Sequence, residues 1–318
     1  MLGAVIGDIA GTFYHLDESN LNNLQFFNDH CALTDDSVMT FAVAEALLNG
    51  AKPDDFIEAM GKYKKLYTDE KGTVITEWGN GVAARVSPCG WFAGSLDEAE
   101  ELAERFARTT HIHPDDIQGA KAVSAAIYMA RTRKRKSDIK NYIDSKYGYH
   151  LDCIIDDIRP RYPWNLSDRD PVAEAFVVVF ESSRFEGAII NALSLGGRRD
   201  KICAITGSLA EAFYGIPSHL VKEVYKFLDA EMETLIMSWI DSGKPLSFAQ
   251  SRQSARKQAV KDKLRAISKS SWDRIKEAGN YISHQSARKQ AVKDKLRAIS
   301  KSSLDRILEA GSQIKWNE

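Results

Sequence analysis

The stretch Gly3-Ala-Val-Ile-Gly-Asp-Ile-Ala-Gly11 places three glycines, four residues apart, among apolar residues and a single carboxylate. At this spacing the glycines share one face of a helix, and each costs roughly 1 kcal/mol relative to alanine in a helix interior. Close packing against another helix would offset that cost, and we favour this explanation over a functional one. Asp8 is different, because a carboxylate beside a crowded apolar face needs a hydrogen-bonding or metal partner.

Beyond this stretch, apolar residues recur at helical spacing through most of residues 1–240, whereas the alternation typical of strands is nearly absent. Helix stops are well formed, as at Gly50 and at Gly215 with Pro217. We therefore predict an all-α fold: a compact multi-helix bundle over residues 1–243, with long loops at 14–32 and 159–171.

A change in composition at Lys244 marks a second region, residues 244–318. Residues 251–318 hold 17 Lys and Arg against 7 Asp and Glu, whereas residues 1–250 hold 26 against 37. Residues 253–279 recur almost unchanged as residues 285–311, which predicts a basic helical extension made of a tandem repeat. Because no aromatic stacking platform accompanies the basic charge, nucleic-acid binding is the weaker interpretation. Docking onto the acidic body or self-association is the alternative to a solvated appendage.

The composition is that of a water-soluble globular protein. No apolar run in the sequence reaches the length of a membrane span, and the first residues lack the pattern of a secretory signal. The four cysteines are widely spaced, without a C-x-x-C pair that would indicate zinc. We expect a cytoplasmic protein with free thiols.

Three short motifs have both a structural and a functional interpretation. Thr34-Asp35-Asp36 is typical of a helix cap, and capping is favoured, yet its oxygens are also a compact ligand set for a hard cation. Gly79-Asn80-Gly81 indicates a turn or a loop that approaches a ligand closely. In Thr110-His-Ile-His-Pro114, zinc binding is disfavoured because no third ligand lies nearby in the sequence.

Taken in order, these motifs resemble the ADP-ribosylglycohydrolase family over roughly residues 1–230. The segments that carry the resemblance are Gly3–Gly11, Thr34–Ser37, Gly79–Gly81, Thr110–Pro114, Tyr147–Leu151 and Ile202–Gly215. The resemblance implies an all-α fold with two Mg²⁺ or Mn²⁺ ions in a central cleft. It also implies hydrolysis of the N- or O-glycosidic bond that joins ADP-ribose to a protein side chain, most often arginine.

The resemblance also implies roles for individual residues. It makes Asp35 and Asp36 catalytic. It implies metal ligation by Thr34, Asp35, Asp36 and Asp200. It implies substrate contacts by Gly79, Asn80, Gly81, His111, Gly197 and Arg198.

The sequence departs from the family pattern at the second metal motif. Where relatives read G-G-D-[ST]-D-[ST], this chain reads Gly196-Gly-Arg-Arg-Asp-Lys201, and His15 stands where a glutamate is usual. Fixed side-chain cations bring positive charge but neither a Lewis acid nor a bound water. We therefore expect one ion, Mg²⁺ or Mn²⁺, instead of two.

Two functions follow for the same ligand, an ADP-ribosylated protein or an ADP-ribose-like molecule. One is hydrolysis at an altered metal site. The alternative is a non-catalytic binding protein in which Arg198, Arg199 and Lys201 contact phosphate. A third class, an assembly protein that reuses the fold, remains open because of the duplicated tail.

Overall fold

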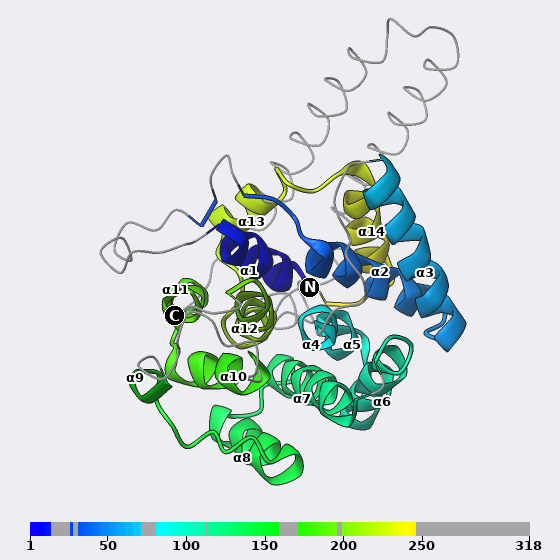
Figure 1. Ribbon diagram of the computed structural model, residues 1–318. Coiled ribbons are helices and arrows are strands. Elements are labelled where there is room, and N and C mark those ends of the chain that lie inside the picture. Colours follow the sequence, from blue (N-terminus) through cyan, green and yellow to red (C-terminus); the bar gives the residue numbers. More distant parts are fainter. Residues whose placement is uncertain are drawn as a thin grey trace, which may run out of the picture. The chain divides into compact units, whose positions relative to one another are not determined.

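The structure is a computed structural model of the chain, and it describes residues 1–13, 26–27, 31–70, 81–111, 113–158, 171–195 and 199–245. The chain divides into two units, Met1–Ser251 and Arg252–Glu318, and every described residue belongs to the first (Figure 1). Most of the two predicted loops, and the whole tandem repeat, lie outside the described residues. The predicted boundary after residue 243 stays a prediction.

The described part of the chain is built from helices, and it contains no strand, which confirms the all-α prediction. The helices are α1 (Leu2–Phe13), α2 (Asp35–Asn49), α3 (Pro53–Lys65), the π-helical turn η2 (Leu66–Glu70), α4 (Val82–Arg85), α5 (Ser87–Phe92), α6 (Leu96–Ala107), α7 (Pro114–Arg131), α8 (Lys136–Tyr147), α9 (Ile155–Ile158), α10 (Pro171–Glu181), α11 (Phe185–Leu195), α12 (Arg199–Tyr214), α13 (Ser218–Val224) and α14 (Ala230–Asp241). None of them is long and apolar enough to cross a membrane.

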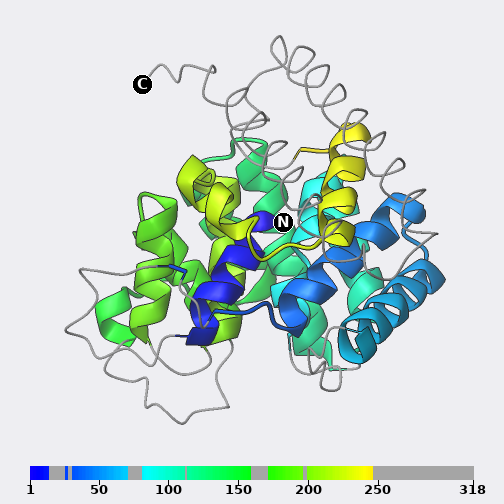
Figure 2. The ribbon, with the colours of Figure 1, turned by 90° about the horizontal axis from the view of Figure 1, so that it is seen from above.

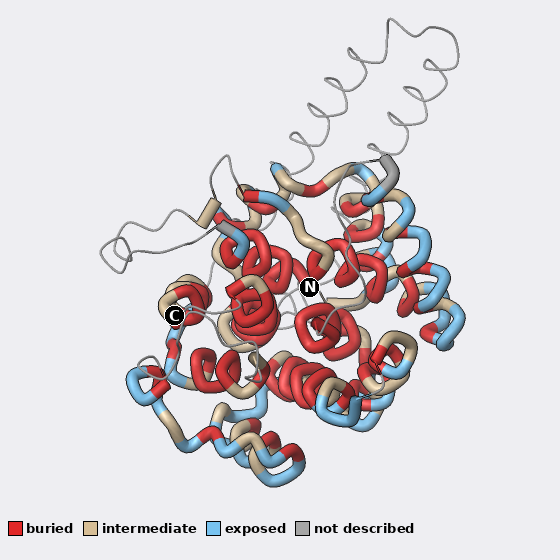
Figure 3. Tube along the Cα trace, viewed as in Figure 1, coloured by how far each residue is buried: buried red, intermediate tan, exposed pale blue. Residues whose placement is uncertain are grey.

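Helix α12 is the central helix of the bundle. Thirteen of its 16 residues are buried, because it packs against α1, α4, α7, α10 and α11. Figure 3 shows the buried residues concentrated along these helices. A helix that is covered on nearly all sides has to be apolar or small on nearly all sides, which explains the run Ile202–Ala210.

The closest helix packing joins α1 to α12. A Cβ atom built on Gly11 would lie 2.6 Å from the carbonyl oxygen of Arg199, and one built on Gly7 would overlap the carbonyl of Cys203. Gly3 faces Gly207 across the same interface. The glycines therefore let the two backbones touch, and the predicted close packing is confirmed, with α12 as the partner.

Helix α2 packs against α3 and α14 (Figures 1 and 2). Thr34 caps its N-terminus, since its hydroxyl accepts the N–H of Asp36 at 3.1 Å, and Gly50 closes the other end. Helix α12 ends before Gly215, which has a φ of 77°. The predicted cap and both predicted stops are confirmed.

Candidate functional site

Asp8 on α1 fixes the start of α2. One of its oxygens accepts the Thr34 N–H at 3.1 Å and the Ser37 hydroxyl at 2.5 Å, and the other accepts the Thr34 hydroxyl at 2.7 Å. The side chain is fully buried. The partner that the sequence required for Asp8 is thus the segment that carries Asp35 and Asp36, and the polar contact positions that segment.

Asp36 is the centre of the candidate site, and it is bonded to two cations. Its Oδ1 accepts the Nε of Arg85 at 2.6 Å, and its Oδ2 accepts the Nζ of Lys201 at 3.0 Å. All three residues are buried. Side-chain cations were expected at the second metal motif, and one of them, Lys201, contacts Asp36.

Arg85 also binds the neighbouring carboxylate, because its Nη2 donates to Asp35 at 2.7 Å. Its guanidinium therefore forms a fork across two adjacent carboxylates, the geometry for which arginine is suited. Arg85 was not among the residues predicted from the sequence. A usable signal was present: an arginine inside the apolar run Val82–Val86 is expected to be buried, and a buried arginine needs an acidic partner.

Gly81 leaves the space in which these groups meet. A Cβ atom on Gly81 would lie 2.5 Å from the Nζ of Lys201, 2.6 Å from the Oδ1 of Asp36 and 3.2 Å from the Nη2 of Arg85. The residue precedes α4 with a φ of −113°, so no backbone strain requires glycine here. Its role is to provide room beside the ion pairs.

The carboxylates of the site have different proton affinities. Burial alone would raise the pKa of Asp36, but Arg85 and Lys201 outweigh it and hold the pKa below its usual value. Burial and the charge of Asp36 raise the pKa of Asp35, against the opposing effect of Arg85. Burial, again with Asp36, raises the pKa of Asp8 to about 7. Asp36 is therefore the fixed anion of the group.

The described side chains do not form a metal site in this arrangement. No three His, Cys, Asp or Glu residues within the described ranges lie together so that they could hold an ion. Both oxygens of Asp36 already accept bonds from cations, and the Thr34 hydroxyl is bonded to Asp8. Mg²⁺ and Mn²⁺ require several free oxygen ligands, so this donor set does not fit them.

The expectation of one ion stays a prediction, because part of its surroundings is not described. Gly197, Arg198 and His15 lie outside the described residues, as do Gly79 and Asn80 of the predicted ligand loop. Asp200 lies in the first turn of α12, where its Cα would be 2.7 Å from a Cβ on Gly11. It does not join Asp35 and Asp36 in a three-ligand group.

The two histidines of the Thr110–Pro114 segment lie between α6 and α7. His111 is buried, with its Nδ1 2.6 Å from the Thr110 hydroxyl. His113 caps α7 by accepting the N–H of Asp115 at 3.3 Å. The absence of zinc at this pair and the substrate role of His111 both stay predictions.

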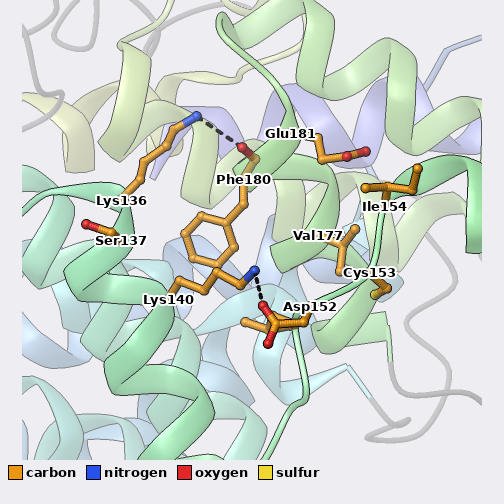
Figure 4. Close-up of a pocket in the computed structure, with 10 residues that line it drawn as sticks. Lys136, Ser137, Lys140, Asp152, Cys153, Ile154, Val177, Phe180 and Glu181 are labelled. Carbon is orange, nitrogen blue, oxygen red and sulfur yellow. Dashed lines mark hydrogen bonds and ion pairs between the residues drawn. The ribbon is translucent and has the colours of Figure 1, made fainter.

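A cavity of about 340 Å³ lies between α8, the segment around Cys153 and α10 (Figure 4). Lys140 on its wall pairs with Asp152 at 2.7 Å, and Lys136 donates to the carbonyl oxygen of Ser182 at 2.6 Å. The two amines are therefore already bonded. The cavity is separate from the candidate site, because its lining includes none of Asp35, Asp36, Arg85 and Lys201.

Comparison with known proteins places the fold and the motifs in one family. The sequence model of a protein family described as ADP-ribosylglycohydrolase matches residues 1–256. The chain therefore belongs to this family. The match extends beyond the range over which the motifs themselves carry the resemblance.

Two individual proteins are similar to this chain. A protein of Archaeoglobus fulgidus described as uncharacterized is 31% identical over 147 residues, which are 42% of this chain and 48% of that protein. The alignment thus spans about half the length of that relative. A solved structure described as an ADP-ribosylglycohydrolase-related protein complex aligns with a TM-score of 0.51 and 21% identity, over 74% of this chain and 93% of the other. That likeness supports the fold.

Proposed function

We propose that this protein acts on ADP-ribosyl groups and hydrolyses the N- or O-glycosidic bond that joins ADP-ribose to a protein side chain, with arginine as the expected linkage. Membership of the family supports the ligand class. The observation that carries the proposal is the fixed position of the acidic segment, in which Thr34 is hydrogen-bonded to Asp8. Within that segment Asp35 is partly exposed at the start of α2, with 23% of its side chain accessible.

In this proposal the two adjacent carboxylates have separate roles. Asp35 accepts the proton of the water that attacks the anomeric carbon, because it is accessible and its pKa is raised by burial and by Asp36. The bond from that carbon to the protein side chain breaks, and the departing side chain takes up the proton. Arg85 orients it from 2.7 Å. Asp36 is buried and bonded on both oxygens, so we assign it to holding Arg85 and Lys201 instead of to proton transfer.

A second function is supported by the same ion pairs. If the cations at Asp36 leave no route to bond cleavage, the protein binds an ADP-ribose-like ligand without hydrolysing it. The observation that favours this alternative is that Asp36, expected to be a catalytic and metal-binding residue, is fully engaged by Arg85 and Lys201. The ligand class is the same in both cases.

Release of ADP-ribose from an ADP-ribosyl-arginine protein separates the two functions. Hydrolysis predicts turnover that Asp35→Asn lowers roughly 10²–10⁴-fold, the usual contribution of a general base. Asp54→Asn is the matched control, because Asp54 is an exposed carboxylate in the first turn of α3. No turnover, together with tight binding of ADP-ribose, would select the binding protein. Neither turnover nor binding would reject both.

A further inference from the structure

Asp36 is a buried anion whose charge has to be balanced by neighbouring groups. It is 1% exposed, and a carboxylate removed from water is stable as an anion only when it is paired and hydrogen-bonded. In a metal site, a divalent cation would provide that balance. Here the balance has to come from the groups that contact the carboxylate.

The two cations that pair with Asp35 and Asp36 match these two carboxylates in number. Arg85 and Lys201 bring two positive charges, and Asp35 and Asp36 bring two negative ones. Each oxygen of Asp36 has its own donor, Arg85 on one side and Lys201 on the other. The two donors come from α4 and α12, which are far apart in the sequence, so the folded chain brings them together.

The space for the ammonium group is part of the fold. Gly81 is the residue beside the Nζ of Lys201, and any side chain there would approach it to 2.5 Å. Lys201 is itself 5% exposed, on a helix that is buried on nearly all sides. Its amine therefore occupies a defined position between Gly81 and Asp36.

We propose that Lys201, together with Arg85, is the permanent counter-ion of Asp36, so that this site keeps its charge balance and its structure without a bound divalent cation. The proposal concerns how the site is held together. It is independent of whether the protein cleaves its ligand or only binds it.

The test is a titration of the full-length protein with MnCl₂, in which free Mn²⁺ is measured by electron paramagnetic resonance and Tm is measured in parallel. For the wild type we expect, in place of the one ion that the resemblance implied, no bound ion and the same Tm with Mn²⁺ or with EDTA. In Lys201→Ala the amine is gone, so Tm should fall and Mn²⁺ should raise it again in a saturable way, with an affinity about tenfold or more above any that the wild type shows.

Two variants serve as controls. Lys201→Arg keeps the charge and should behave like the wild type towards Mn²⁺. Lys226→Met removes an exposed lysine that pairs with Glu223, so neither its Tm nor its Mn²⁺ binding should change. A wild-type protein that binds Mn²⁺ with a rise in Tm would overturn the proposal, and so would a Lys201→Ala variant as stable as the wild type. The wild-type titration decides by itself if Lys201→Ala does not fold.

Discussion

Asp8 on α1 accepts hydrogen bonds from both the backbone N–H and the hydroxyl of Thr34, at 3.1 and 2.7 Å. The same hydroxyl also accepts the N–H of Asp36 and so caps α2. The position of the acidic segment is thus coupled to α1, and through the glycine interface to α12, which carries Lys201. Two helices that are distant in the sequence thereby set the geometry of one site.

Asp8→Ala should destabilise the protein by more than about 2 kcal/mol, because it leaves one buried and two partly buried donors without their acceptor. Urea unfolding measures the effect. Asp54→Ala is the control: this exposed carboxylate should change the free energy of unfolding by less than about 1 kcal/mol. Equal stability of the two variants would contradict the positioning role of Asp8.

Arg85→Met should destabilise the protein by about 3–5 kcal/mol, because it leaves Asp36 buried with an unpaired oxygen. In Arg108→Met the lost partner is Glu104 in an exposed pair, so the expected loss is at most about 1 kcal/mol. Thermal unfolding of both variants checks the difference. A small effect at Arg85 would mean that Lys201 alone is enough to balance Asp36.

Gly7→Ala should destabilise the protein by at least about 1–3 kcal/mol, since the added methyl group overlaps the backbone of α12 and forces the helices apart. Gly61→Ala is the matched control, because no atom lies within 4 Å of its Cβ position in the middle of α3. There alanine should stabilise the helix by about 0.5–1 kcal/mol. The prediction fails if the two changes have the same sign.

Glu100 should make stability depend on pH in the acid range. It accepts hydrogen bonds from Lys146, Tyr142 and Tyr147 at 2.5, 2.5 and 2.7 Å. Burial raises its pKa, but these bonds outweigh burial and lower the pKa below its usual value. Because the folded pKa is depressed, the stabilisation is complete above the unfolded pKa, about 4.3, and is lost as the pH falls through the folded pKa.

Glu100→Gln should therefore be less stable than the wild type at neutral pH, and the difference should shrink in acid. Urea unfolding at a series of pH values measures this, with Glu58→Gln, an exposed position on α3, as the control. A difference between wild type and Glu100→Gln that does not vary with pH would show that the carboxylate has no special stability in the folded state.

Local features of the fold could be predicted from the sequence, since their causes are local. Thr34 is a capping residue directly before an apolar periodic run, and the cap forms as expected. The glycines of α1 indicated close packing, but their spacing could not identify α12 as the partner. That choice depends on contacts across about 200 residues of chain, which no short motif encodes.

The site was predictable in its acidic half and only partly in its basic half. Asp35, Asp36 and Lys201 belong to recognisable motifs, whereas Arg85 belongs to none. Its role became visible once the folded chain brought α4 beside the start of α2. The charge of Arg85 within the apolar segment Val82–Val86 indicated that it needed an acidic partner, but did not identify that partner.

The most direct test of the account is a calorimetric titration of the full-length protein with ADP-ribose in a buffer that contains a chelator. Metal-independent recognition of the ligand predicts saturable binding under these conditions, and Asp54→Asn should leave the affinity unchanged. Binding that appears only after Mn²⁺ is added, or no binding in either buffer, would contradict it.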